Sequence, residues 1–166
     1  GVLYEYGVAG RKVWDSAKNT WGDWEAMDEV VLTKEHFADL WKKIATEFKD
    51  YTNIWGYDLM NEPKGININT LFDNYQAAIH AIREVDTKAQ IVIEGKNYAS
   101  AAGWEGSSDI LKDLVDPVNK IVYQARTYFD KNNTGTYKNS YDQEIGGNVE
   151  IYKQRIDPVS YTHLTL

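Results

Sequence analysis

The sequence predicts an α/β protein with a parallel sheet, because helical and strand patterns alternate singly along the chain. Apolar residues recur every three or four positions in two segments, and short β-rich runs follow each of them. The resulting order of helix, strand, helix, strand, helix, strand is typical of repeated β/α units. Both an open doubly wound sheet and part of a (β/α)8 barrel fit this order. A complete barrel takes roughly 250 residues, so 166 residues hold only part of one.

The first predicted helix follows Thr33, a residue type that caps helix N-termini. Its apolar stripe consists of Phe37, Leu40, Trp41, Ile44, Ala45 and Phe48. A buried strand is predicted over residues 53–60, which are rich in β-formers and are stopped by Pro63. Ahead of these elements, Trp14, Trp21 and Trp24 lie in a polar stretch, where they either extend a sugar-binding cleft or cover the barrel mouth.

The second predicted helix runs from about residue 70 to residue 85 and is followed by a short strand over residues 91–94. The inner face of this helix consists of Leu71, Tyr75, Ile79 and Ile82. A short helix over residues 109–115 ends before Pro117, because the residue before proline resists the α region. Residues 120–129 then read as a strand, and residues 130–147 as a long loop.

Composition excludes several classes of function. The chain has 25 acidic and 18 basic residues, a net charge of −7, which argues against nucleic acid or an anionic membrane as partner. No apolar run approaches the length of a membrane span. There is no cysteine, so disulfides and thiolate chemistry are excluded. The chain opens on Gly1 without a leader pattern, which predicts a mature product or an internal fragment.

Polar residues gather where the predicted strands end, which is where α/β folds place their chemistry. These residues are Asn61, Glu62, Glu94, Arg126, Tyr128 and Asp130. Glu62 is either an exposed loop glutamate or a positioned carboxylic acid, and its place at the mouth of an apolar strand favours the acid. No Gly-rich phosphate loop follows any strand, which weakens a nucleotide-binding alternative. No cofactor or metal is expected, since the three histidines are far apart and the Asp130 loop carries Tyr141 where calcium needs a glutamate.

Residues 57–63, Tyr-Asp-Leu-Met-Asn-Glu-Pro, closely resemble the fourth-strand signature of glycoside hydrolase family 5, the cellulase-like retaining glycosidases. Residues 37–45 and 76–83 are similar to the family helices on either side of that strand. Residues 120–130 are similar to the sixth strand. The resemblance implies a partial (β/α)8 TIM barrel, roughly the third to sixth β/α units.

The expected domain division is a partial catalytic domain over residues 1–155 and a divergent or non-native tail over residues 156–166. That tail is rich in β-branched and turn-forming residues and does not continue the helix expected there. A genuine but divergent tail is the alternative.

The resemblance also implies roles for individual residues. Glu62 matches the general acid/base, Asn61 the residue that hydrogen-bonds the sugar 2-hydroxyl, and Tyr128 the tyrosine that orients the catalytic carboxylate. Trp104 falls where the family often stacks a tryptophan on sugar, with a core tryptophan as the equal alternative. The implied reaction is retaining hydrolysis of β-1,4-glucan, cellulose or a related polysaccharide, through two carboxylates.

Three departures from the family pattern qualify this expectation. The nucleophilic glutamate of the seventh strand has no match, and the last acidic candidates are Glu144 and Glu150. Arg126 stands where the family has histidine, and a permanent cation favours the ionised form of a carboxyl, the wrong direction for an acid. Residues 4–7 also lack the histidine of the third-strand motif. The third departure is the tail.

We therefore expect a fragment of a secreted, monomeric endo-β-1,4-glucanase that is inactive as this chain alone. A non-catalytic barrel remnant that binds β-glucan is the alternative.

Overall fold

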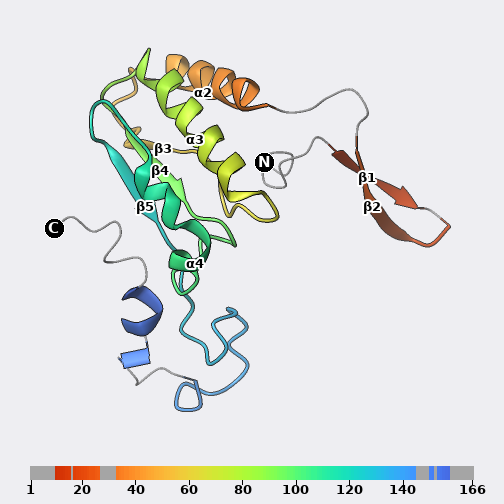
Figure 1. Ribbon diagram of the computed structural model, residues 1–166. Coiled ribbons are helices and arrows are strands. Elements are labelled where there is room, and N and C mark those ends of the chain that lie inside the picture. The colour runs from red at the N-terminus through yellow and green to blue at the C-terminus, as the bar shows by residue number, and fades with distance from the viewer. Residues whose placement is uncertain (1–9, 16, 27–32, 145–149, 152, 158–166) are drawn as a thin grey trace.

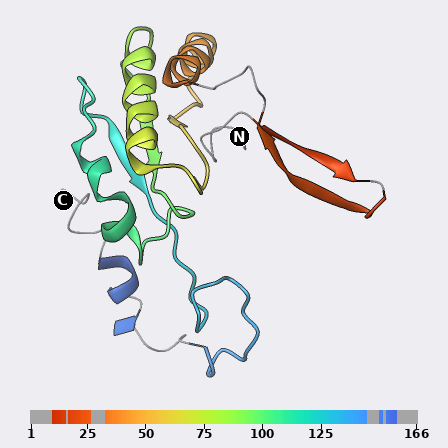
Figure 2. The same cartoon turned by 45° about the vertical axis from the view of Figure 1, so that its right-hand side comes forward.

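The computed structural model describes residues 10–15, 17–26, 33–144, 150–151 and 153–157. Within these residues a parallel sheet and its helices form the main body, and a two-stranded hairpin stands away from it (Figures 1 and 2). No described helix is long and apolar enough to cross a membrane.

The hairpin consists of β1 (Gly10–Asp15) and β2 (Thr20–Ala26), which pair antiparallel with Trp14 opposite Trp21. No element was predicted here from the sequence, although two tryptophan-bearing runs flank a polar turn. Asn19 completes that turn with a left-handed φ of 49°, which asparagine tolerates better than most residues.

The three-stranded sheet has the order β3-β4-β5, with all strands parallel. The strands are β3 (Gly56–Asp58), β4 (Gln90–Glu94) and β5 (Ile121–Gln124), and Tyr57 pairs with Ile91 and Ile93 with Tyr123. Helical segments connect each strand to the next, because parallel neighbours require a crossover. The predicted α/β fold with a parallel sheet is confirmed.

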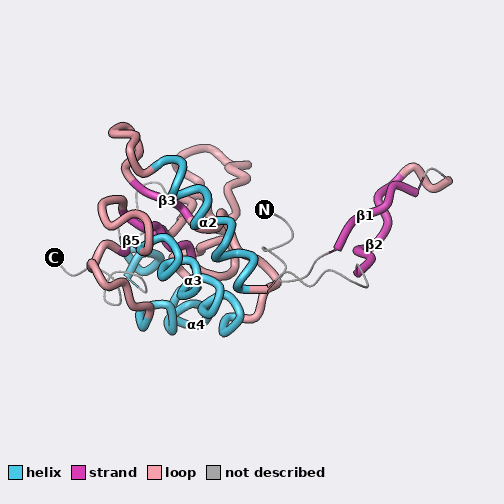
Figure 3. The backbone as a smooth tube through the Cα atoms, turned by 90° about the horizontal axis from the view of Figure 1, so that it is seen from above, coloured by secondary structure: helices cyan, strands magenta, loops and turns pink. Residues whose placement is uncertain are grey.

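Helices α2 (Lys34–Phe48) and α3 (Ile68–Arg83) pack on each other and cover the sheet together with α4 (Trp104–Ser108) (Figure 3). The predicted inner face of α3 is confirmed, since all four of its apolar residues are buried. The start of α2 at Thr33 is also confirmed. Its stripe is narrower than predicted, because Leu40 and Phe48 are exposed at its flanks, while Phe37 and Ala45 reach the core.

Both outer strands are shorter than predicted. Trp55 is 65% exposed and precedes β3, so the first half of the predicted strand lies outside the sheet. After β5 the backbone turns to a different partner, with the Arg126 N–H donating to the Ala99 carbonyl at 2.7 Å and the Ala101 N–H donating to the Arg126 carbonyl at 2.8 Å. The segment after β5, which carries Arg126, is therefore held by backbone hydrogen bonds to the loop at residues 99–101 rather than by the sheet.

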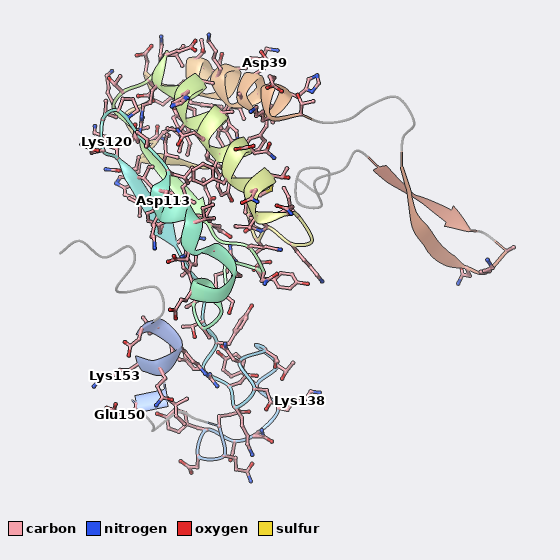
Figure 4. The ribbon with its side chains drawn as sticks, viewed as in Figure 1. Asp39, Asp113, Lys120, Lys138, Glu150 and Lys153 are labelled. Carbon is pink, nitrogen blue, oxygen red and sulfur yellow. The ribbon has the colours of Figure 1, made fainter. Side chains whose placement is uncertain are left out.

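The short helix predicted over residues 109–115 begins earlier, as α4, and continues as the 3-10 turn η1 (Asp109–Asp113). Farther along, residues 150–151 and 153–157 are helical. Figure 4 shows Lys138 on the loop after β5, and Glu150 and Lys153 on this helical segment. The predicted tail over residues 156–166 is described only at Ile156 and Asp157, and the remainder lies outside the described residues, as does the 4–7 motif.

A buried polar network ties together the amino-terminal ends of the strands. The Arg83 guanidinium donates two hydrogen bonds to the Asp116 carboxylate, at 2.8 and 2.9 Å, and one to the Asp86 carbonyl at 3.0 Å. The Tyr57 hydroxyl donates to the Asp86 carboxylate at 2.8 Å. The network thereby links β3, α3 and the loops that precede β4 and β5.

Candidate active site

The carboxyl-terminal ends of the three parallel strands bring Glu62, Glu94 and Arg126 into one cluster of ion pairs. Arg126 donates from Nη1 to Glu62 Oε1 at 2.9 Å and from Nη2 to Glu94 Oε1 at 2.8 Å. The same Nη2 reaches Asn61 Oδ1 at 2.6 Å. Arg126 therefore contacts both residues of the Asn-Glu pair that the sequence singled out.

The backbone of Glu62 is held in an unusual conformation. Its φ is 49°, in the left-handed region that non-glycine residues enter at a cost of about 1–3 kcal/mol. The Glu62 N–H donates to Glu94 Oε2 at 2.7 Å, and the next residue, Pro63, accepts from the Tyr98 N–H at 3.2 Å. These contacts on both sides fix the direction in which the Glu62 side chain leaves the chain.

The cluster has more carboxyl groups than cations. Asp58 is exposed at the sheet edge, but partial desolvation, together with the charge and hydrogen bonding of Glu94, raises its pKa to about 6. The hydrogen bond to Glu94 and the charges of the neighbouring carboxylates raise the pKa of the Arg126 guanidinium, which therefore stays charged. Asp58 thus holds a proton in mildly acidic solution, while Arg126 is shared between Glu62 and Glu94.

A cavity of about 640 Å³ opens beside this cluster. Its lining residues are Glu62, Asn97, Tyr98, Ser100, Gly103, Arg126, Tyr128, Asn133 and Thr134. The Glu62 side chain is 32% exposed, so its carboxyl reaches the cavity despite the ion pair. Tyr98 and Tyr128 both expose their rings. Exposed aromatic rings beside a carboxyl suit a flat, hydroxyl-rich ligand.

Trp104 does not line this cavity, and the prediction that it stacks on sugar is wrong for this structure. Its side chain is 0% exposed, and its ring stands edge-on to Tyr123 at a centroid distance of 6.2 Å. The backbone at Gly95 passes so close that an added Cβ would lie 2.6 Å from the Trp104 ring. Trp104 fills the core, as the alternative interpretation held, because α4 turns the side chain inward.

Tyr98 is an aromatic residue of the cavity that was not predicted from the sequence. It follows the end of β4 by four residues and lies in a run of three left-handed residues, Asn97 at 59°, Tyr98 at 62° and Ala99 at 55°. The Lys64 ammonium lies 4.7 Å from the Tyr98 ring centroid. Its place in the loop after a strand end was a usable signal, because that loop borders the site in α/β folds.

Tyr128 is positioned by the loop that follows it. The buried Asp130 carboxylate accepts from the N–H groups of Thr134 at 2.9 Å and Gly135 at 3.1 Å. Burial opposes ionisation of Asp130, but the backbone N–H of Gly135 and the bonds from Thr134 outweigh it and lower its pKa to about 2. Arg155 closes the loop from outside by donating to the carbonyls of Tyr128 at 2.7 Å and Asp130 at 2.9 Å.

Metal-binding geometry is absent from the part of the chain that the structure describes, where no group of three or more acidic or histidine side chains could hold an ion. The Asp130 oxygens that a calcium loop would use are instead satisfied by N–H and hydroxyl donors.

Comparisons with known proteins agree with this arrangement. Residues 13–159 match the family model described as Cellulase (glycosyl hydrolase family 5). Endo-beta-1,4-glucanase B of Emericella nidulans is 35% identical over 119 residues, which are 71% of this chain and 36% of that protein. Endoglucanase 3 of Humicola insolens is 32% identical over 120 residues, 72% of this chain and 31% of that protein.

Solved structures give the same result. Endoglucanase Cel5A of Pseudomonas stutzeri, determined in complex with cellobiose, superposes with a TM-score of 0.67 at 31% identity, over 83% of this chain and 41% of that chain. Cel5A (EG2) of Hypocrea jecorina superposes with a TM-score of 0.58 at 26% identity, over 74% of this chain and 40% of that chain. The chain spans 31% to 36% of the length of the two sequence relatives.

Proposed function

Because the chain belongs to glycosyl hydrolase family 5, we propose that the complete protein containing it is an endo-β-1,4-glucanase that acts on cellulose or a related β-glucan. The observation that carries this proposal is the carboxyl of Glu62, which reaches a cavity of about 640 Å³ at the carboxyl-terminal end of β3. Two exposed tyrosines, Tyr98 and Tyr128, border the same cavity.

In the proposed reaction Glu62 serves first as an acid and then as a base. As a nucleophilic carboxylate attacks the anomeric carbon, Glu62 gives its proton to the departing glycosidic oxygen. Water then attacks the anomeric carbon of the glycosyl–enzyme intermediate while Glu62 takes a proton from that water. The bond between the sugar and the nucleophilic carboxylate breaks, which releases the nucleophile. Asn61 is proposed to hydrogen-bond the sugar 2-hydroxyl, and Tyr128 to orient the catalytic carboxylate.

The second carboxylate is proposed to come from outside the described site. Glu94 is 0% exposed and carries hydrogen bonds on both oxygens, and the N–H groups of Lys131 and Asn139 occupy the Glu144 carboxylate. Neither carboxylate lines the cavity beside Glu62, where a nucleophile has to meet the sugar. We therefore propose that the 166 residues alone do not cleave glucan. We also propose that the chain covers roughly the third to sixth units of a (β/α)8 barrel, with β3 to β5 as the fourth to sixth strands.

Several smaller proposals accompany this function. We assign the catalytic part to residues 1–155 and regard residues 156–166 as divergent or non-native. A polymeric glucan is too large to enter a cell, so we propose that the complete enzyme is secreted, and that it acts as a monomer without a cofactor.

Reducing-end release from a soluble β-glucan, measured beside affinity electrophoresis in the same glucan, tests the proposed function. The complete protein is expected to migrate more slowly in the glucan-containing gel and to release reducing ends from the soluble glucan. A non-catalytic glucan-binding protein is the second candidate, favoured by the ion pair that holds Glu62 to Arg126 at 2.9 Å. Retardation without cleavage would establish that candidate, and neither retardation nor cleavage would exclude both.

Arg126→His in the complete protein is expected to raise glucan turnover. Arg126 keeps a permanent charge 2.9 Å from the Glu62 carboxyl and favours its ionised form, whereas histidine can be neutral at the working pH. Comparing kcat for the two proteins on the same glucan checks this. Unchanged or lower turnover would show that Arg126 does not impede the acid.

Gly135→Ala is expected to lower kcat/KM by about 10-fold, by pushing the Tyr128 ring out of place. An added Cβ would lie 2.6 Å from Tyr128 Cε1, and the φ of 73° at Gly135 strains any other residue by about 1 kcal/mol. Gly106→Ala is the matched control, because nothing lies within 4 Å of its added Cβ. Equal kcat/KM values for the two variants would show that the position of Tyr128 does not affect the reaction.

A further inference from the structure

Glu94 is a buried carboxylate whose function the proposed mechanism leaves open. It ends the central strand β4, and its side chain is 0% exposed. Its Oε2 accepts from the Glu62 N–H at 2.7 Å, and its Oε1 accepts from Arg126 Nη2 at 2.8 Å and from the Gln124 amide. On the other side, the Tyr75 hydroxyl fixes the Glu94 carbonyl at 2.9 Å.

Placing a carboxylate in this position is costly unless its hydrogen bonds are needed. Burial of a charge opposes folding unless it is paired and hydrogen-bonded, and an apolar side chain would fill the end of a central strand at lower cost. Both Glu94 oxygens instead serve the segment around Glu62. One holds the backbone amide of Glu62, and the other holds the guanidinium that contacts the Glu62 carboxyl.

The Glu62 backbone needs such a contact. Its left-handed φ of 49° persists only where the surroundings compensate for the strain, and the N–H bond to Glu94 is made in this conformation. The Pro63 ring that follows cannot donate a hydrogen bond of its own. Without Glu94, the amide of Glu62 would lose its acceptor, and the Arg126 guanidinium would keep Glu62 as its only carboxylate partner among these contacts.

We propose that Glu94 is a positioning residue for the proposed acid/base. It fixes the Glu62 backbone through the amide, and it shares the Arg126 guanidinium with Glu62, so that Arg126 is not paired with Glu62 alone. This inference rests on the proposed function. The charged or titratable groups that face Glu94 are Asp58 from β3, Glu62 from the loop after β3, Arg126 from the segment after β5 and Tyr75 from α3.

Glu94→Gln and Glu94→Ala in the complete protein test the inference on soluble β-glucan. Glutamine keeps an acceptor oxygen and nearly the same volume but loses the charge, so kcat is expected to fall about 10-fold with KM within about 2-fold. Alanine loses both contacts, so a fall of about 100-fold is expected, the size of effect that a misplaced catalytic group produces.

The pH profile separates positioning from a loss of structure. Removing the Glu94 charge makes Glu62 easier to ionise, so the alkaline limb of kcat/KM is expected to move to lower pH in Glu94→Gln. The same comparison in an Asp58→Asn background removes the other carboxyl that faces Glu94. Glu105→Gln, on the exposed surface of α4, is the matched control and is expected to match the wild type.

If Glu94→Gln has the same kcat and the same alkaline limb as the Glu105→Gln control, the inference is overturned. The proposed function is then left intact. If the wild-type complete protein cleaves no glucan, the proposed function fails. A crystal structure of the Glu94→Gln variant then decides the inference. Loss of the left-handed Glu62 conformation or of the Arg126 contact supports it, and unchanged geometry overturns it.

Discussion

Glu62→Gln is expected to lower kcat of the complete protein on β-glucan by about 1,000-fold. General acid–base catalysis contributes roughly 100- to 10,000-fold, and the glycosidic oxygen of a glucan is a poor leaving group without a proton. Glutamine has nearly the same size and can keep the hydrogen bond that Arg126 Nη1 now donates to Glu62 Oε1 at 2.9 Å. The variant therefore removes the proton and leaves the site's shape.

Two further measurements make this test specific. An aryl glycoside with an acidic phenol as leaving group needs no protonation, so its first step is expected to change far less than glucan cleavage. Azide is expected to restore turnover of that substrate, because a small anion attacks the intermediate without a base. Glu105→Gln provides the control for losing a carboxylate elsewhere on the surface. Full glucan activity in Glu62→Gln would remove Glu62 from the mechanism.

Arg83→Met is expected to lower the free energy of unfolding of the complete protein by about 3–5 kcal/mol. The side chains of Arg83 and Asp116 are only 3% and 1% exposed, and two hydrogen bonds join them. Removing one partner of a buried pair leaves the other charge without compensation, which is the source of the large cost. Urea unfolding measured by fluorescence gives the difference.

Lys43→Ala is the matched control for this experiment. Its ion pair with Asp39 lies on the surface of α2, with side chains 73% and 60% exposed, so a loss below about 0.5 kcal/mol is expected. A second variant, Asp116→Asn, leaves Arg83 unpaired and is expected to destabilise by a similar amount. Equal stability of Arg83→Met and Lys43→Ala would show that the buried pair does not support the fold.

The cost of Arg83→Met is expected to depend on pH. Burial opposes ionisation of Asp116, but the hydrogen bonds from Arg83 and from the N–H groups of Lys120 and Val118 outweigh it and lower the pKa of Asp116. Stability from a lowered carboxyl pKa is fully present above the ordinary value of about 3.9, and it is lost as the pH falls below that value and through the lowered pKa of the folded protein. The difference in the free energy of unfolding between Arg83→Met and the wild type should therefore become smaller below about pH 4.

Much of the fold could be predicted from periodicity alone. The inner face of α3 was correct at every residue, because a helix that packs on a sheet must turn one continuous apolar stripe toward it. The strand over residues 91–94 was also correct, since a central strand is apolar on both faces. The edge strands were predicted too long, because their sequences remain β-rich where the backbone leaves the sheet.

Local pattern could place Glu62, Asn61, Arg126 and Tyr128 at strand ends, and it could identify the family motif around Glu62. Whether an individual side chain is buried or faces the cavity depended on neighbours far away in the chain. Trp104 is buried because α4 turns it against Tyr123, and Tyr98 is exposed because three left-handed residues present it to the cavity.

The amino-acid sequence by itself determined the α/β class, the helix faces and the residues at the strand ends, because these follow from spacing and backbone chemistry within short segments. Only the tertiary structure decided that Glu94 holds the Glu62 amide, 32 residues away, and that Arg126 joins both carboxylates, 64 and 32 residues away. Parallel strands bring such distant residues to one edge of the sheet, and no local pattern encodes which of their side chains then meet.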